Sequence, residues 1–139
     1  MTHLLDTNVL SESSRPKTAS RNVLAWLGKM PEDLLFTSAV SIGEVRLGIE
    51  KLTPKDVGRA QSLEIWLHAT LPKFGSRILP VDEPVAQLWG RLSAGRTVPV
   101  IDTYIAATAL VHGLTVATRN IKDFAWTGVP TFDPFAFAG

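Results

Sequence analysis

Short apolar runs alternate with longer segments of helical periodicity along the whole chain. Adjacent apolar residues in runs too short for a helix predict buried strands. Segments in which apolar residues recur three and four positions apart predict the helices between them. The predicted strands are 3–6, 34–37, 78–81, 114–118 and 129–132, and the predicted helices are 7–12, 19–30, 38–52, 53–71, 82–92 and 100–112.

Polar residues, prolines and a glycine mark where several of these helices begin and end. Thr53 and Pro54 predict a helix start, with Thr53 as the cap and Pro54 in the first turn. Pro72 is expected to end that helix, because a proline inside a helix removes a hydrogen bond. Asp82 predicts another cap, and Gly113 ends the last long helix. That last helix is apolar almost all round, which predicts that it is buried.

Strands that alternate with helices indicate an α/β fold with a mostly parallel sheet. The segments between the predicted strands are long enough to hold the helical crossovers that parallel pairing needs. Ligands of such sheets bind beyond the carboxyl ends of the strands, near a change in strand order. Asp6 occupies that position after the first strand, and Thr118-Arg119-Asn120 occupies it after the fourth.

The composition limits the classes of protein to consider. A chain of 139 residues predicts one domain, 1–139, and a hydrophobic share of 45% is enough for a core. The chain has no cysteine, no basic-then-apolar leader and no apolar run of membrane-spanning length, so we expect a cytoplasmic protein. A net charge of +1 neither indicates nor excludes a nucleic-acid partner.

Four carboxylates far apart in sequence are the candidate chemical groups, and each also has an ordinary interpretation. Asp6 follows a strand and can simply cap the next helix. Glu44 follows Ser41 at the spacing of a capping box, although Thr37 or Ser38 is the better helix start. Asp102 can favour the positive end of its helix. The last of the four is Asp123, which as a loop residue can be merely solvated.

A metal ion would explain the four carboxylates together. Two like charges about 4 Å apart cost about 4 kcal/mol at an effective dielectric constant near 20. A cluster of carboxylates therefore persists only if one is protonated or a divalent cation binds. Oxygen ligands without cysteine or paired histidine suit Mg²⁺ or Mn²⁺ better than Zn²⁺.

At these residues the sequence resembles the PIN domains, specifically the VapC-type ribonuclease toxins with their FitB-like branch. The resemblance extends over essentially the whole chain, and several motifs in the right order make it specific. The matching stretches are LLDTNVLSE at 4–12, TSAVSIGEVRLGI at 37–49, VIDTYIAATALVHGLTVATRN at 100–120 and IKDF at 121–124, with GVPTFDPF near the end.

This resemblance implies a PIN-like three-layer sandwich and a Mg²⁺- or Mn²⁺-dependent endoribonuclease. The family's catalytic acids fall on Asp6, Glu44, Asp102 and Asp123, and its supporting polar residues fall on Thr7, Asn8, Thr118 and Asn120. We expect Asp6 and Asp102 to bind the metal directly, because both adjoin rigid apolar elements. Either of the other two acids would orient the attacking water. Many PIN domains have an aspartate where this chain has an asparagine, at position 120.

The resemblance also implies partners: an RNA substrate, a cognate VapB-like antitoxin and a second copy in a homodimer. A stretch without acids contains Arg15 and Lys17, which are candidates for RNA contact. The alternative for that stretch is an ordinary solvated surface. The alternative for the whole chain is an inactive PIN-like module that binds RNA or a protein without cutting.

Overall fold

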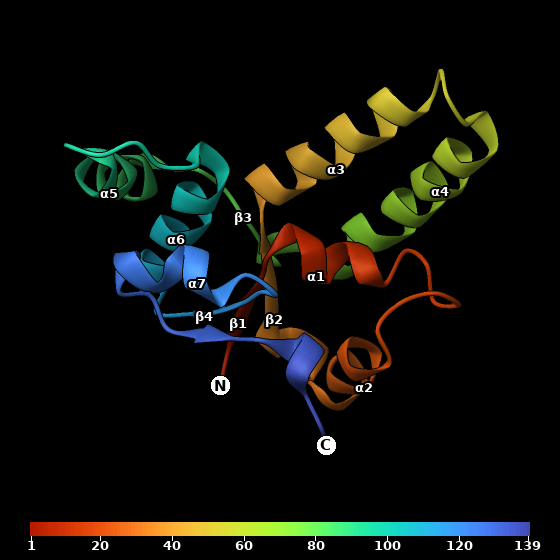
Figure 1. The fold of residues 1–139 in the computed structure, drawn as a ribbon, viewed down its shortest axis with the longest axis horizontal. Helices are drawn as coiled ribbons and strands as arrows, with labels where there is room; N and C mark the ends of the chain where they lie inside the picture. The colour runs from red at the N-terminus through yellow and green to blue at the C-terminus, as the bar shows by residue number, and fades with distance from the viewer.

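The computed structural model describes residues 1–139, and its centre is one sheet of five parallel strands in the order β3-β2-β1-β4-β5. The sheet grows outward from β1 in both directions, so the strand order reverses between β1 and β4 (Figure 1). The predicted parallel sheet is confirmed. The strands are β1 (His3–Leu5), β2 (Leu35–Ser38), β3 (Ile78–Leu79), β4 (Thr115–Ala117) and β5 (Thr131–Phe132).

Seven α-helices and four short 3₁₀ helices surround the sheet, which confirms the predicted sandwich. The α-helices are α1 (Thr7–Glu12), α2 (Arg21–Lys29), α3 (Ala39–Leu52), α4 (Val57–Phe74), α5 (Glu83–Ser93), α6 (Val100–His112) and α7 (Ile121–Phe124). The 3₁₀ helices are η1 (Glu32–Leu34), η2 (Gly75–Arg77), η3 (Ala125–Thr127) and η4 (Pro134–Ala136).

Two hydrophobic clusters lie on opposite faces of the sheet. Side chains alternate between the faces of a strand, so Leu5 packs into one cluster and its neighbour Leu4 into the other. The cluster around Leu5 contains buried residues of α1, α2, α3 and α4. The cluster around Leu4 contains buried residues of α6 and α7. Burial on both faces fixes the register of the central strands.

Several helix ends follow the predicted chemistry. The Ser38 side chain accepts a hydrogen bond from the Val40 amide at the start of α3, and Asp82 accepts one from the Val85 amide at the start of α5. Gly113 follows α6 with a positive φ of 68°, a conformation that only glycine adopts without strain. These three predicted helix ends are confirmed.

The predicted start and end of the helix after Thr53 are wrong. The Thr53 hydroxyl donates to the Ile49 carbonyl and so ends α3, while the Asp56 side chain caps α4 through the Arg59 amide. Pro72 lies inside the last turn of α4, which continues to Phe74. A proline this close to the end removes only one helical hydrogen bond, so the helix can absorb it.

The expectation of a fully buried α6 is only partly confirmed. Residues 105–109 are buried, but Val100 is 54% exposed at its first turn and Val111 is 38% exposed near its end. No helix in the structure combines the length and the apolar character that crossing a membrane would need.

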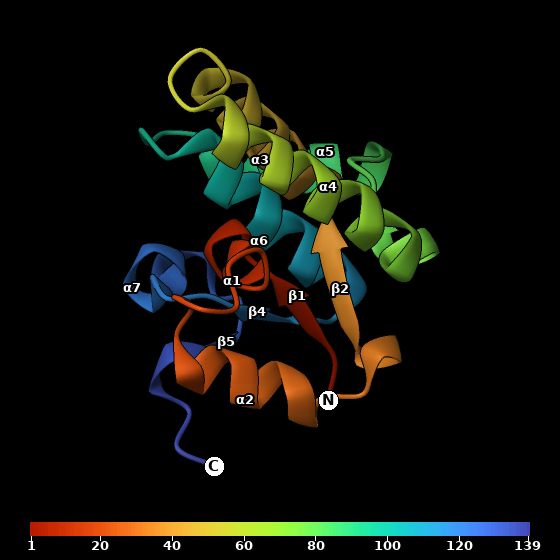
Figure 2. The same cartoon turned by 90° about the vertical axis from the view of Figure 1, so that its right-hand side faces the viewer.

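The topology places the ends of β1 and β4 side by side. β1 and β2 run in the same direction, α1 begins directly beyond β1, and α3 begins directly beyond β2 (Figure 2). The carboxyl ends of β1 and β4 therefore meet at the point where the strand order reverses, which is where ligands of open α/β sheets bind.

Candidate metal-dependent active site

Asp6 joins the end of β1 to the start of α1. Its amide donates to the Ala117 carbonyl of β4 over 2.9 Å, which extends the strand pairing by one residue. Its carboxylate oxygen Oδ1 accepts from the Thr7 amide over 2.8 Å. The side chain is only 4% exposed. Asp6 therefore caps α1, as its ordinary interpretation predicts.

Two further donors hold the other carboxylate oxygen of Asp6. Oδ2 accepts from the buried Thr118 hydroxyl over 2.7 Å and from the Asn8 amide group over 3.2 Å. A carboxylate offers about four lone-pair positions, and these three bonds occupy most of them. Oδ1 accepts from only one protein donor, so it keeps a free lone pair with which it could bind a cation.

Glu44 reaches the same end of the sheet from α3. It lies in the helix interior, because Ser38 rather than Ser41 caps α3, so the capping-box interpretation is wrong. The Thr7 hydroxyl donates to Oε1 of Glu44. Thr7 therefore contacts both acids, because its backbone amide donates to Asp6 and its hydroxyl donates to Glu44.

Asp102 lies in the first turn of α6 and is half-buried. Burial, followed by the negative charges of Asp6, Asp123 and Glu44, raises the pKa of its carboxyl group to about 6. All three of the other acids are therefore close enough to repel Asp102. Successive acids are 38, 58 and 21 residues apart along the chain (44 − 6, 102 − 44 and 123 − 102), so it is the fold that brings the other three charges near Asp102.

Asp123 lies on α7 and is exposed, so its expected position in a loop is wrong. The chain enters α7 through Asn120, whose side chain makes no capping hydrogen bond. The Asn120 backbone amide donates to the Thr118 hydroxyl over 3.0 Å. Asn120 therefore acts on Asp6 only indirectly, because its backbone amide binds the Thr118 hydroxyl that donates to Asp6. The side chains of Thr7, Asn8 and Thr118 bind the acids directly.

The electrostatic environment of Asp6 combines opposing influences. Burial raises the pKa of Asp6 above its ordinary value, the hydrogen bonds from Thr118, Thr7 and Asn8 act against this, and the charge of Glu44 adds to it. Two neighbouring carboxyl groups, Asp6 and Asp102, thus both hold their protons more tightly than isolated aspartates. A divalent cation would relieve this repulsion.

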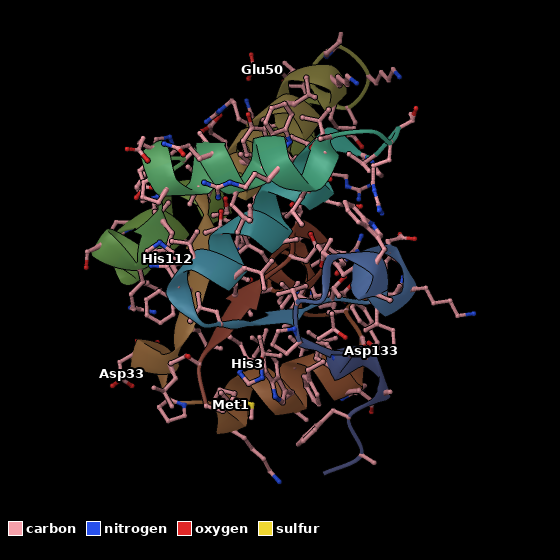
Figure 3. All side chains as sticks on the ribbon, turned by 90° about the vertical axis from the view of Figure 1, so that its left-hand side faces the viewer. Met1, His3, Asp33, Glu50, His112 and Asp133 are labelled. Atoms are coloured by element: carbon pink, nitrogen blue, oxygen red, sulfur yellow. The ribbon has the colours of Figure 1, made fainter.

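The donor atoms suit Mg²⁺ or Mn²⁺, but the acids do not form a closed cage. No three His, Cys, Asp or Glu side chains converge closely enough to hold one ion together. Other potential ligands, including Glu50, His112 and Asp133, lie at separate places around the molecule (Figure 3). Mg²⁺ commonly uses only one or two carboxylates and completes its shell with water and substrate phosphate. Two of the four acids would therefore be enough for such a site.

The raised pKa of Asp102 predicts how the Asp102→Asn substitution changes stability with pH. A folded-state pKa of about 6 means that ionisation of Asp102 weakens the fold as the pH rises from about 4 to about 6. Without divalent ions, we expect Asp102→Asn and the unsubstituted chain to be similarly stable near pH 4. Above pH 6 the variant should be more stable, by about 1–3 kcal/mol.

Thermal unfolding in EDTA across this pH range measures the difference directly. Comparing the two proteins at each pH removes the effects of the titrating groups that do not interact with Asp102. A difference that stays constant from pH 4 to pH 7, or that favours the unsubstituted chain at neutral pH, would show that Asp102 is not under this repulsion.

A further buried carboxylate, which is not among the predicted site residues, lies at the end of α1. Glu12 is 5% exposed and accepts from the Ser20 amide over 2.7 Å and from the Arg15 guanidinium over 2.9 Å. The two expected RNA-contacting residues are both exposed, but Arg15 forms an ion pair with Glu12 and Lys17 forms none.

The comparison with protein families identifies a PIN domain over residues 3–127. The chain is 40% identical to the protein named Toxin FitB of Neisseria gonorrhoeae, over 95% of this chain and 97% of that protein. It is 33% identical to the protein named VapC ribonuclease Y4jK of Sinorhizobium fredii, over 95% of this chain and 96% of that protein.

Solved structures give the same result. The crystal structure described as FitAcB from Neisseria gonorrhoeae matches with a TM-score of 0.87 and 38% identity, and the match covers 98% of this chain and 100% of that one. A structure described as FitAB bound to a DNA fragment matches with a TM-score of 0.86 and 35% identity, over 99% of each chain. The chain therefore belongs to the PIN-domain family, within the group of FitB-like and VapC-type toxins.

Proposed function

We propose that this protein is the toxin of a type II toxin–antitoxin pair and a Mg²⁺- or Mn²⁺-dependent endoribonuclease. The observation that carries the proposal is that three other acids, Asp6, Glu44 and Asp123, lie close enough to Asp102 for their charges to act on it. Burial and then these charges raise the pKa of Asp102 to about 6. A protein that only binds RNA gains nothing from a cluster of negative charges that repels phosphate. The names of the relatives support ribonuclease activity.

In this proposal Asp6 and Asp102 hold the cation. A bound divalent cation would neutralise charge on the phosphate and lower the pKa of the water molecule bound to it. Thr118, Asn8 and the Thr7 amide fix the orientation of the Asp6 carboxylate. The Glu44 carboxylate keeps one oxygen beyond its bond to Thr7. Either that oxygen or the exposed Asp123 carboxylate orients the attacking water and accepts its proton.

The hydrogen bond from Thr118 to Asp6 predicts a positioning effect. Thr118→Val keeps the shape of this fully buried side chain but removes the donor to Oδ2. Loss of a group that orients a metal ligand typically costs about 10- to 100-fold in metal affinity or activity. We expect an RNA cleavage rate lower by that factor at limiting Mn²⁺, partly restored at higher Mn²⁺ concentration.

Thr108→Val is the matched control, because the Thr108 hydroxyl is equally buried but donates to a carbonyl within α6. Equal rates for Thr118→Val and Thr108→Val at every Mn²⁺ concentration would mean that Thr118 does not orient the metal ligand.

An assay that records binding and cleavage together separates the enzyme from an inactive binding module. Purified protein is incubated with end-labelled structured RNA in Mg²⁺, in Mn²⁺ and in EDTA. Our proposal predicts cut products with either metal and intact RNA in EDTA. RNA that is bound but uncut under all three conditions would favour the binding module.

We further propose that the chain acts as a single domain, pairs with a VapB-like antitoxin and forms a homodimer. The solved relatives described as FitAcB and FitAB support an antitoxin partner. A mostly apolar cavity of about 290 Å³ between α1, α2 and α4 offers room for apolar side chains of such a partner. An arginine of the partner would neutralise the acids in place of the metal. An RNA substrate would place this activity in the cytoplasm.

A further inference from the structure

A second charged group adjoins the carboxylates, on the side of α1 and the β4–α7 connection. It consists of Arg15, Arg119 and the buried carboxylate of Glu12. Oε1 of Glu12 accepts from Arg15 and Oε2 accepts from the Ser20 amide. Burial acts to raise the pKa of Glu12, but these hydrogen bonds and the positive charges of Arg15 and Arg119 outweigh it, so the pKa lies below its ordinary value. Glu12 is therefore an anion that faces two guanidinium groups.

Arg119 is fixed in place at both its backbone and its side chain. Its amide donates to Oδ1 of Asn8 over 3.3 Å, and the same Asn8 side chain donates to Asp6. Its guanidinium lies over the Phe135 ring, with the Cζ atom 3.9 Å from the ring centre. Arg119 therefore directly follows Thr118, whose hydroxyl binds Asp6, and the Phe135 ring holds the exposed guanidinium group in place.

Arg15 pairs with Glu12 and borders the acids on the side of Glu44. It lines a cleft of about 420 Å³ together with Thr7 and Glu44. Its side chain is 49% exposed although its partner Glu12 is buried. Arg59 of α4 lines the same cleft. A polyanion that extends from the acids along this cleft would therefore meet the Arg15 guanidinium.

The charges of this group do not cancel. Two guanidinium groups face one carboxylate, which leaves one positive charge unpaired. The Arg119 guanidinium makes no hydrogen bond or ion pair with the protein, so its N–H donors remain available. Guanidinium groups bind phosphate through two parallel hydrogen bonds, and a phosphate beside Glu12 would neutralise the excess charge.

We propose that Arg15 and Arg119 together form a contact for an RNA phosphate next to the cleavage site, with Glu12 as the buried residue around which they are arranged. The inference rests on the proposed ribonuclease function, because it names the groups that hold the substrate for that reaction. RNA is favoured over an acidic protein segment because Arg15 lines the same cleft as Glu44, one of the acids on which the scissile phosphate would lie.

The salt dependence of RNA binding tests this contact. The probe is a fluorescein-labelled single-stranded RNA, and its anisotropy gives the affinity of the Asp102→Asn protein in EDTA at several salt concentrations. Each phosphate neutralised on a single strand contributes about 0.7 to the slope of log affinity against log salt. Because the two arginines contact one phosphate, the double variant should reduce the slope by about 0.7, and Arg15→Ala and Arg119→Ala should each reduce it by part of that amount.

Two controls separate a phosphate contact from a structural role. Arg119→Lys retains the charge and should retain the slope. Arg91→Ala removes an exposed arginine of α5 and should change nothing. If Arg119→Ala binds RNA with the slope of Arg91→Ala, the proposal is wrong, even if its affinity or thermal stability falls. Cleavage by the unsubstituted chain in Mg²⁺, measured in parallel, reports separately on the proposed function.

Discussion

Replacing either Asp6 or Asp102 by asparagine is expected to reduce RNA cleavage by about a thousandfold while the protein stays folded. Each substitution removes one of the charged oxygens that would hold the cation, and a catalytic metal ion contributes several kcal/mol to stabilising the transition state. A thousandfold loss corresponds to about 4 kcal/mol. The rate of product formation from end-labelled RNA at saturating Mg²⁺ measures it.

The two substitutions should differ in their effect on stability. Asp102 makes no hydrogen bond within the protein and is repelled by three acids, so Asp102→Asn relieves repulsion. Asp6 accepts three hydrogen bonds, two of them on Oδ2, and an asparagine cannot accept all of them. We therefore expect the melting temperature to rise in the first variant and to fall in the second.

Asp33→Asn is the matched control, because Asp33 is an exposed aspartate of η1 that lies apart from the site (Figure 3). It should cleave RNA at the rate of the unsubstituted chain. Undiminished cleavage by Asp6→Asn or by Asp102→Asn would remove that residue from the metal site.

Added Mg²⁺ or Mn²⁺ is expected to stabilise the unsubstituted protein strongly. A ligand that binds only the folded state at a hundredfold excess over its dissociation constant adds about 2.7 kcal/mol. For a chain of this size that corresponds to roughly 5–10 °C in melting temperature. Relief of the repulsion among the four carboxylates is the physical source of the binding energy.

The same titration of Asp102→Asn should give a much smaller shift, because the variant has lost both a ligand and the repulsion that the cation relieves. NaCl at matched ionic strength controls for general screening. Equal shifts with NaCl and with Mg²⁺, or equal shifts in the variant and the unsubstituted chain, would mean that no specific cation binds at these carboxylates.

The sequence predicted the sheet, and the position of Asp6 at its edge, because the signals are local and mutually consistent. The apolar runs at Leu4-Leu5 and Val116-Ala117 are buried on both faces, so periodicity alone identified these strands. Asp6 and Thr118 follow them directly, and parallel pairing of β1 with β4 brings the two residues together. The helix caps Ser38 and Asp82 were predictable because each of them bonds to an amide only two or three residues away.

The errors arose where two local signals competed or where the contact was distant in sequence. Thr53 and Asp56 are both good caps, and only the observed turn shows that the first ends α3 and the second starts α4. The short helix α7 has too few residues for periodicity to show. The role of Glu12 depends on Ser20 and on Arg119, which lies more than 100 residues away, so no pattern along the chain could reveal it.

The most direct test of metal-dependent cleavage is a titration of Mn²⁺ into EDTA-treated protein, with the cleavage rate of end-labelled RNA as the readout. The unsubstituted chain and Asp102→Asn are measured side by side. We predict a rate that rises from background to saturation with Mn²⁺ for the unsubstituted chain and stays near background for Asp102→Asn. Cleavage at full rate before any Mn²⁺ is added, or identical titration curves for the two proteins, would contradict this mechanism.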